Sequence, residues 1–377
     1  MNDEAVRALD LPTVGLLDPI EQPHQPPLRL GVAGCGRVFE RSHLPAIERG
    51  GQWSLVGACD PLWERRAWVA RRCPGIAVFE SLDALLGAGV LDALLVASSP
   101  ASHAQLAIQA LRHGVNVLVE KPMALTLAEA AAMFGAARQT RRQLWVGFNR
   151  RCCRPYRRLR DRLAELPGRP VRAVYSEFLS GTGRWDAIGR HLGQEALGGG
   201  ILDDIGSHQV DLLTWLVGRP ALEARVQYHA RDEPGASAVR FQLRFEGGLV
   251  AHCRAAHAAS FRESVAVALD DRILWADSVG LIESRGLSLN GLRTLYEPRA
   301  LAASGLRRLT GNPSELARGF EAQLGAFAAA VRAGHSREDA ADAASGARVM
   351  QVIQACRESR DDGGGSRQIG PALEPTE

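Results

Sequence analysis

The chain has 377 residues, which is enough for two domains, and its 46% hydrophobic and 23% charged residues are ordinary for a soluble globular protein. A net charge of +3 gives no electrostatic reason to expect nucleic acid as the main partner, and no apolar run is long enough to span a membrane. Seven cysteines without a Cys-x-x-Cys pair, and an N-terminus without the segments of a signal peptide, favour a cytoplasmic protein.

The first region, residues 28–150, alternates short apolar strands with helical segments, and we expect a flexible leader before it over residues 1–27. Strands that are apolar throughout and separated by helices predict a parallel sheet covered on both faces, which is the doubly wound Rossmann architecture of nucleotide-binding domains. In chain order the expected strands are 28–33, 55–59, 76–79, 91–97, 115–119 and 144–148, and the expected helices are 44–49, 62–72, 81–86, 102–113 and 126–139.

A glycine-rich turn joins the first expected strand to the first expected helix. Gly34 and Gly36 allow backbone N–H groups to approach a pyrophosphate at the N-terminus of that helix. The full pattern has a small residue where this chain has Phe39, so the pattern is incomplete. The turn therefore predicts a dinucleotide site only together with its surroundings.

Asp60 ends the second strand, close to where an acidic side chain binds the ribose hydroxyls of a dinucleotide. The alternative is an Asp-Pro turn before the next helix. A carboxylate here repels a 2′-phosphate, which favours NAD over NADP, although Arg65 and Arg66 follow within reach of such a phosphate.

Of the 45 lysine and arginine residues, only Lys121 is a lysine. It follows the fifth expected strand, at the same sheet edge as residues 98–103 after the fourth, where ligands bind in open parallel sheets. An ammonium differs from a guanidinium where a compact charge or a shiftable pKa is required. We therefore expect Lys121 to face the cofactor cleft, with chance survival at an indifferent position as the alternative. Ser102 is expected to cap the helix that follows.

The second region, residues 151–358, has strands that follow one another without regular intervening helices. This pattern predicts an α+β domain with an open, mostly antiparallel sheet. We expect a hairpin turn at Glu246-Gly247-Gly248 and a flexible tail over residues 359–377. The expected strands are 171–179, 222–229, 239–245, 249–257 and 264–269, and the expected helices are 205–217, 314–333 and 338–357.

Asp204, His208 and Asp211 are spaced i, i+4, i+7 in the first of these helices, which predicts one helical stripe. A carboxylate one turn from an imidazole can orient the ring and favour its protonated form, an arrangement that suits a general base. The alternative is a solvated surface stripe. We expect no metal site, because no second histidine lies at ligand spacing and His191 is 17 residues upstream.

These motifs together resemble the Gfo/Idh/MocA oxidoreductase family, named for glucose–fructose oxidoreductase and inositol dehydrogenase. The matching stretches are Gly34-Cys35-Gly36, His43-Leu44-Pro45-Ala46, Ala58-Cys59-Asp60-Pro61, Asp92-Ala93, residues 98–103, Glu120-Lys121-Pro122-Met123, Val146-Gly147-Phe148-Asn149-Arg150-Arg151 and residues 198–211. The resemblance implies NAD(P)-dependent oxidation or reduction of sugars and polyols. It also implies that Lys121, Asp204 and His208 occupy the positions of the family's catalytic lysine, aspartate and histidine, and that copies dimerise or tetramerise through the C-terminal sheet.

The expected reaction is reversible hydride transfer between nicotinamide and a carbinol carbon of a small sugar, sugar acid, nucleotide sugar or polyol, with His208 as base and Lys121 on the substrate oxygen. The expected cofactor-binding residues are Gly34, Gly36, Arg37, Val38, Asp60, Ser98, Ser99, Pro100, His103, Glu120 and Lys121. The expected substrate-binding residues are Lys121, Asn149, Arg150, Arg151, Asp204 and His208. The first alternative function is a non-catalytic NAD(P)-binding sensor. The second, which ranks below it, is a reductase of a conjugated ring system.

Overall fold

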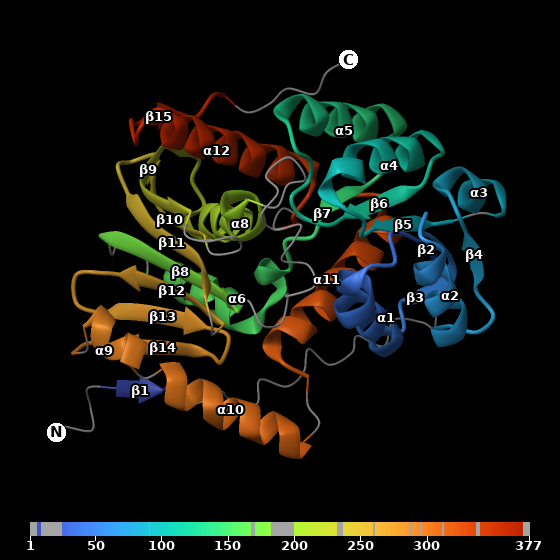
Figure 1. The fold of residues 1–377 in the computed structure, drawn as a ribbon. Coiled ribbons are helices and arrows are strands. Elements are labelled where there is room, and N and C mark those ends of the chain that lie inside the picture. Colours follow the sequence, from blue (N-terminus) through green and yellow to red (C-terminus); the bar gives the residue numbers. More distant parts are fainter. Residues whose placement is uncertain are drawn as a thin grey trace.

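The computed structural model describes residues 6–8, 25–89, 91–166, 170–181, 200–231, 237–258, 261–286, 288–294, 296–310, 313–336 and 340–371. Two sheets lie side by side, a parallel sheet in one half of the molecule and a broader mixed sheet in the other (Figure 1). The two expected sheets are therefore confirmed.

The parallel sheet has the strand order β4-β3-β2-β5-β6-β7, so the chain order reverses between β2 and β5. Ligands of doubly wound folds bind outside the carboxyl ends of the strands at such a reversal. Its strands are β2 (Leu28–Ala33), β3 (Trp53–Cys59), β4 (Ala77–Phe79), β5 (Ala93–Val96), β6 (Asn116–Val119) and β7 (Leu144–Val146). The helices between them are a π-helix η1 (Phe39–His43), α1 (Leu44–Gly50), α2 (Trp63–Arg72), α3 (Leu82–Gly87), α4 (Pro100–Arg112) and α5 (Leu127–Thr140).

The second sheet has the order β1-β14-β13-β12-β8-β11-β10-β9-β15, and among its described strands only β8 and β11 pair in parallel. The predicted turn at Glu246-Gly247-Gly248 joins β10 to β11 as an antiparallel hairpin. The strands are β1 (Val6–Ala8), β8 (Ala173–Gly181), β9 (Ala221–Arg231), β10 (Ser237–Phe245), β11 (Val250–Ala258), β12 (Arg262–Ala268), β13 (Ile273–Asp277), β14 (Leu281–Ser284) and β15 (Arg367–Gln368).

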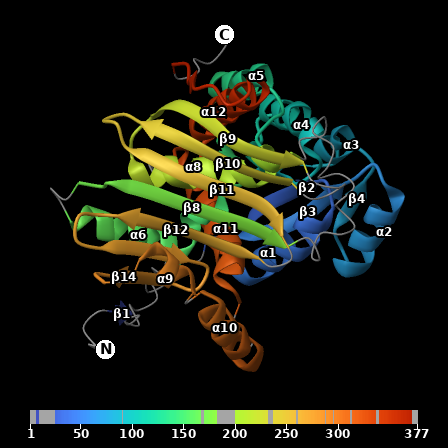
Figure 2. The same ribbon diagram turned by 60° about the vertical axis from the view of Figure 1, so that its left-hand side comes forward.

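Most helices of this half lie on one face of the sheet, and its broad outer face is toward the viewer in Figure 2, where the short helix over residues 289–294 packs on the β12–β14 end. Side chains alternate accordingly along β8, where Val174 and Phe178 belong to the apolar core and Tyr175 points to the other face. The helical segments are η2 (Asn149–Cys152), α6 (Arg154–Ala164), a π-helix η5 (Leu202–Gly206), α8 (Ser207–Val217), α9 (Leu289–Thr294), α10 (Tyr296–Thr310), α11 (Glu315–Ala333) and α12 (Ala343–Asp361).

The structure differs from the expected pattern in both terminal segments. β1 pairs with β14, and α12 runs to Asp361 before β15 pairs with β9, so parts of the expected leader and tail belong to the sheet. Gly363 and Gly364 adopt φ values of +72° and +96°, which turn the chain back from α12 onto β9. The glycines that we interpreted as a frayed end therefore form a turn.

The last long helices tie the two sheets together. α11 packs on the nucleotide domain, where Trp53 stacks on Phe327 at 5.5 Å and donates its indole N–H to the carbonyl oxygen of Leu324 at 2.9 Å. α12 lies against both β9 and α5 (Figure 1). Residues assigned by sequence to the second domain thus complete the core of the first.

Candidate active site

The glycine turn after β2 has one position that admits only glycine and one that is open. Gly34 has φ +92°, and a Cβ there would lie 2.4 Å from the backbone nitrogen of Ser98, so β2 and β5 could not approach with any side chain. A Cβ on Gly36 would meet nothing within 4 Å. The helix begins directly afterwards, at Arg37 and Val38, with its first N–H groups at the carboxyl edge of the sheet. Phe39 is fully buried against Trp68 and leaves the turn open.

Asp60 has the turn role that we held as the alternative. One carboxylate oxygen accepts the N–H of Leu62 at 2.9 Å, and the other accepts the N–H of Cys35 at 2.8 Å. The carboxylate thereby fixes the glycine turn from the next strand. Ribose binding by Asp60 stays a prediction, since each oxygen keeps a further lone pair.

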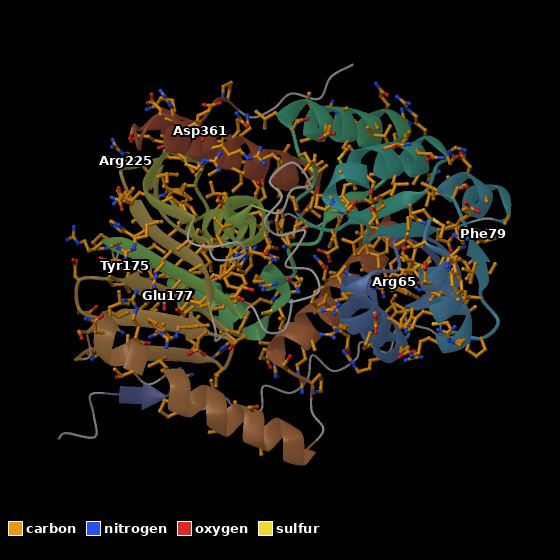
Figure 3. The ribbon with its side chains drawn as sticks, in the orientation of Figure 1. Arg65, Phe79, Tyr175, Glu177, Arg225 and Asp361 are labelled. Carbon is orange, nitrogen blue, oxygen red and sulfur yellow. The ribbon has the colours of Figure 1, made fainter. Side chains whose placement is uncertain are left out.

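Arg65 and Arg66 are engaged near the same carboxylate. Arg65, labelled in Figure 3, pairs with Glu40 at 3.3 Å. Arg66 donates to the carbonyl oxygens of Asp60 and Pro61, each at 2.8 Å. Both guanidinium groups that could meet a 2′-phosphate thus have partners within the protein.

The segment after β5 supports the site through hydrogen bonds of its side chains. The predicted cap by Ser102 is wrong, because α4 begins at Pro100 and Ser99 is the residue before it. Ser102 lies in the first turn, where its hydroxyl contacts that of Ser98 at 2.7 Å. The His103 ring is 1% exposed and spans the carbonyl oxygens of Pro122 and Ser98, at 2.9 and 3.2 Å. The enclosed ring of His103 thus supports the loop after β6, and cofactor binding by His103 stays a prediction.

Lys121 reaches the second domain. Its ammonium forms an ion pair with the carboxylate of Asp204 and donates to the carbonyl oxygen of the same residue at 3.1 Å. The two side chains are 16% and 25% exposed. Burial opposes ionisation of Asp204, but the Lys121 charge and its hydrogen bond outweigh burial and hold the pKa of Asp204 below its usual value. The lone lysine and a residue of the predicted stripe therefore meet across the domain boundary.

Glu120 supports this lysine from behind. One carboxylate oxygen lies 2.6 Å from His43 Nε2, and the other accepts the backbone N–H of Lys121 at 3.2 Å. A Cβ on Gly147 would lie 2.9 Å from the same carboxylate, so the glycine makes room for it. Glu120 is buried and its contacts orient the loop, and cofactor binding by Glu120 stays a prediction.

His208 differs from the expectation in its partner. We expected Asp204 to orient the ring, but Asp204 is drawn to Lys121, and His208 Nε2 lies 3.3 Å from Arg150 Nη1. The physical reason lies in η5, a π-helix that ends just before His208 and changes the i, i+4 stacking of an α-helix. Burial first, and then the charges of Arg150 and Lys121, lower the pKa of His208 well below its ordinary value, so the expected preference for the protonated ring is wrong.

The arginines that we expected to bind substrate form buried ion pairs, and substrate binding by them stays a prediction. Arg150 pairs with Glu263 at 3.1 Å, and Arg151 binds Asp211 through two nitrogens, the shorter contact being 2.6 Å. Asn149 is fully buried and accepts a hydrogen bond from Arg150 at 2.8 Å. Burial raises the pKa of Asp211 although Arg151 opposes the shift. Asp211 therefore belongs to the domain interface and not to a surface stripe.

Four residues at the site were not predicted from the sequence. Glu263 holds Arg150, Tyr156 donates its hydroxyl to Glu263, His43 holds Glu120, and the charge on Asp204 is influenced by His257 at the end of β11. Only His43 carried a signal, because it belongs to a motif that we quoted. The other three are distant in sequence from the groups they contact.

The residues present fit a bound dinucleotide. The open position at Gly36, the exposed start of a helix and the carboxylate of Asp60 form a cradle where the strand order reverses. Within the described ranges, no group of three or more His, Cys, Asp or Glu side chains could hold a metal ion. No helix among the described residues is long and apolar enough to cross a membrane.

Comparison with known proteins decides between families that share this architecture. Residues 28–148 match the model described as an oxidoreductase family with an NAD-binding Rossmann fold, and residues 156–273 match the model of the GFO/IDH/MocA C-terminal domain. The chain belongs to the Gfo/Idh/MocA family. The expected family and its nicotinamide dinucleotide cofactor are thereby confirmed.

Relatives within the Gfo/Idh/MocA family include the inositol 2-dehydrogenase of Leifsonia xyli subsp. xyli, 31% identical over 209 residues, which are 55% of this chain and 59% of that protein. The D-glucoside 3-dehydrogenase of Escherichia coli K12 is 29% identical, with 55% of this chain and 59% of that protein covered. The chain thus spans about six tenths of the length of these curated relatives.

Solved structures share the fold of about nine tenths of the chain. The myo-inositol 2-dehydrogenase from Lactobacillus plantarum superposes with a TM-score of 0.75 at 19% identity, covering 91% of this chain and all of that one. The WlbA dehydrogenase from Bordetella pertussis, solved with NADH and UDP-GlcNAcA, gives a TM-score of 0.73 at 22% identity and covers 92% of this chain and 98% of its own.

Proposed function

We propose that this chain is a nicotinamide-dependent oxidoreductase that interconverts a secondary alcohol and a carbonyl in a small polyhydroxylated substrate, such as a sugar, sugar acid, nucleotide sugar or polyol. The observation that carries the proposal is the ion pair between Lys121 and Asp204, which joins the one lysine of the chain, at the carboxyl edge of the parallel sheet, to the second domain. His208 lies close enough for the Lys121 charge to act on its ring.

Each part of the site has a distinct task in this proposal. The turn at Gly34 and Gly36, the helix start and Asp60 would hold the dinucleotide, whose nicotinamide supplies or accepts the hydride when bound. Lys121 would hold the substrate oxygen and stabilise the negative charge that develops on it. The hydroxyl proton must leave as the C–H hydrogen departs with its electron pair. Lys121 and His208 are the two groups here that can exchange that proton.

We propose NAD as the preferred cofactor. The buried Asp60 carboxylate would repel a 2′-phosphate, while Arg65 and Arg66 are bound to Glu40 and to backbone carbonyls. We expect NADH to bind at least about tenfold more tightly than NADPH, a difference of about 1.4 kcal/mol, in a titration followed by protein fluorescence. Equal affinities would contradict the assignment.

The reaction is tested by screening polyols, aldoses, uronic acids and nucleotide sugars for a change in nicotinamide absorbance with each cofactor. With any substrate found, Lys121→Arg and Asp204→Asn should each lower kcat/KM by about 10²-fold or more, the range of a positioned acid or base. Asp203→Asn is the matched control, because this neighbouring carboxylate pairs with Arg357 and not with Lys121. Near-wild-type turnover by Lys121→Arg would refute the role of the ammonium, and NADH binding without turnover of any compound would favour a sensor.

We also propose that two copies associate through the outer face of the second sheet. This face carries Tyr175 and Glu177 of β8 (Figure 3), with Arg254 beside Glu177 at 3.0 Å and Arg240 opposite Arg254 on β10. Light scattering should give a dimer or larger assembly, and reversing the charge in Arg254→Glu should weaken it. A monomer at micromolar concentration would contradict this proposal.

A further inference from the structure

Arg150 contacts His208 from a position that allows the guanidinium almost no freedom. Its Nη1 is shared by two acceptors, Asn149 Oδ1 at 2.8 Å and His208 Nε2 at 3.3 Å. Arg150, Asn149 and His208 are 6%, 0% and 7% exposed. One guanidinium nitrogen therefore contacts two buried side chains at the site.

The other end of the guanidinium is held by Glu263 and its surroundings. Nε donates to Glu263 Oε1 at 3.1 Å and Nη2 donates to Oε2 at 3.1 Å, while Tyr156 donates its hydroxyl to Oε1 at 3.2 Å. The plane of Arg150 lies over the ring of Phe178 at 5.2 Å. Contacts from β12, α6 and β8 thus fix the direction in which Arg150 donates to His208.

Arginine can only donate hydrogen bonds, because its guanidinium stays protonated and has no acceptor. His208 must then present the lone pair of Nε2, which places the proton of the neutral ring on Nδ1. By the same argument Asn149 presents its oxygen to Arg150 and keeps its amide Nδ2 for another partner. Among the described residues, His208 Nδ1 and Asn149 Nδ2 are both buried without a hydrogen-bond partner.

Two unsatisfied donors in one buried cluster are costly, at about 1–3 kcal/mol each, and such groups in a native protein call for a partner. Water or a ligand with acceptor oxygens would satisfy them. Hydroxyl, carbonyl and carboxylate oxygens are such acceptors, and they are the atoms that a polyhydroxylated substrate offers.

We propose that Arg150 is a positioning residue that holds His208 as the neutral Nδ1–H tautomer, so that His208 Nδ1 and Asn149 Nδ2 donate hydrogen bonds to substrate oxygens. This inference rests on the proposed function and deepens it. His208 then acts as a donor and not as the proton acceptor. In the oxidising direction the hydroxyl proton would pass to Lys121 Nζ as Lys121 passes one of its own protons to the Asp204 carboxylate, the Nδ1–H of His208 would stay intact, and a bound nicotinamide would accept the hydride.

The electrostatic surroundings of His208 agree with this role. Burial, Arg150 and Lys121 all lower its pKa, so the ring stays neutral at physiological pH. The charged and titratable groups that influence this cluster are Arg150, Lys121, Asp204, Cys153, Tyr156, Glu263 and His257. The positive groups act directly on His208, and Glu263 is neutralised by its pairing with Arg150.

The tautomer is read directly in full-length protein labelled with ¹⁵N-histidine, with the His208 signals assigned by their loss in His208→Gln. In the wild type we expect the Nδ1–H pattern, unchanged between about pH 5.5 and 8. In Arg150→Gln we expect His208 to titrate toward its ordinary pKa, and kcat/KM to gain an acid limb that the wild type lacks. Arg272→Lys is the matched control, because Arg272 is an equally buried arginine that pairs with Glu283 and does not contact His208.

Tyr156→Phe serves where Arg150→Gln does not fold, because it removes only the hydroxyl that steadies Glu263. It should shift the His208 titration in the same direction by a smaller amount. An Nε2–H pattern in the wild type, titration of His208 near its ordinary pKa, or an unchanged His208 in both folded variants would overturn the inference. The expected tautomer in a protein that turns over no compound would leave the inference standing and overturn the proposed function.

Discussion

Gly36 and Gly34 stand two residues apart in the same turn. Their alanine variants should separate the effect of this turn on cofactor binding from its effect on folding. A methyl group in Gly36→Ala enters open space, and Gly36 is not among the residues with positive φ. We therefore expect its free energy of unfolding to stay within about 0.5 kcal/mol of the wild type. The same methyl group occupies the volume into which a pyrophosphate must come close, so NADH affinity should fall at least about tenfold, or 1.4 kcal/mol.

Gly34→Ala is the matched variant with the opposite signature. Its methyl group would lie 2.4 Å from the backbone nitrogen of Ser98, and the backbone has φ +92°. Backbone strain alone costs about 1–3 kcal/mol, and the displacement of β5 adds to it, so unfolding should become easier by about 3 kcal/mol or more. Urea unfolding without cofactor measures the first quantity and NADH titration the second. A stable Gly36→Ala protein with wild-type NADH affinity would refute the assignment of this turn to the pyrophosphate.

Three further outcomes follow from buried groups. Because the pKa of His208 is lowered in the folded protein, the unfolded chain takes up the proton first as the pH falls. The free energy of unfolding should therefore decrease below about pH 6.5 by up to 1.4 kcal/mol per pH unit. Urea titrations at several pH values should show a weaker dependence of this free energy on pH in His208→Gln than in the wild type. Asp211→Asn should lower the free energy of unfolding by about 3–5 kcal/mol in the same assay, because it leaves Arg151 buried without its partner charge. The double variant Arg151→Met with Asp211→Leu should recover much of that loss, and equal losses in the two variants would contradict this expectation. Burial raises the pKa of Cys35 to about 12, so mass spectrometry should find Cys35 unmodified by a thiol reagent in the folded protein, and rapid labelling would show that the turn opens.

The parallel sheet could be predicted closely because its strands are buried on both faces. β2 and β6 consist almost entirely of apolar residues between turn signals, and short runs of this kind are typical of strands buried on both faces. The sheet then places Lys121 by topology alone, since every strand ends at the same edge. β13 and β14 were missed because they are short and carry acidic residues. Their stability comes from pairing with neighbours, which a local pattern does not reveal.

The partners of charged groups could not be predicted from spacing. Asp204 and His208 stand at helical spacing, yet Asp204 binds Lys121, 83 residues earlier in the chain, and Arg150 contacts His208 from 58 residues away. Each carboxylate pairs with the cation that tertiary structure brings nearest, and a π-helical turn is enough to redirect it. The sequence therefore identified Lys121, Arg150, Asp204 and His208 but not Glu263 or Tyr156, and only the fold could show which of them contact each other.

The position of α11 has a consequence for how the protein is made. Trp53 and Trp145 of the nucleotide domain pack against Phe327, which a ribosome delivers about 180 residues after the second of them. Until Phe327 is synthesised, that apolar surface is exposed on the nascent chain, where it can bind chaperones or aggregate. In a recombinant fragment ending near residue 150 this apolar surface would stay exposed. Fusing residues 313–336 to such a fragment should cover the surface again and restore solubility.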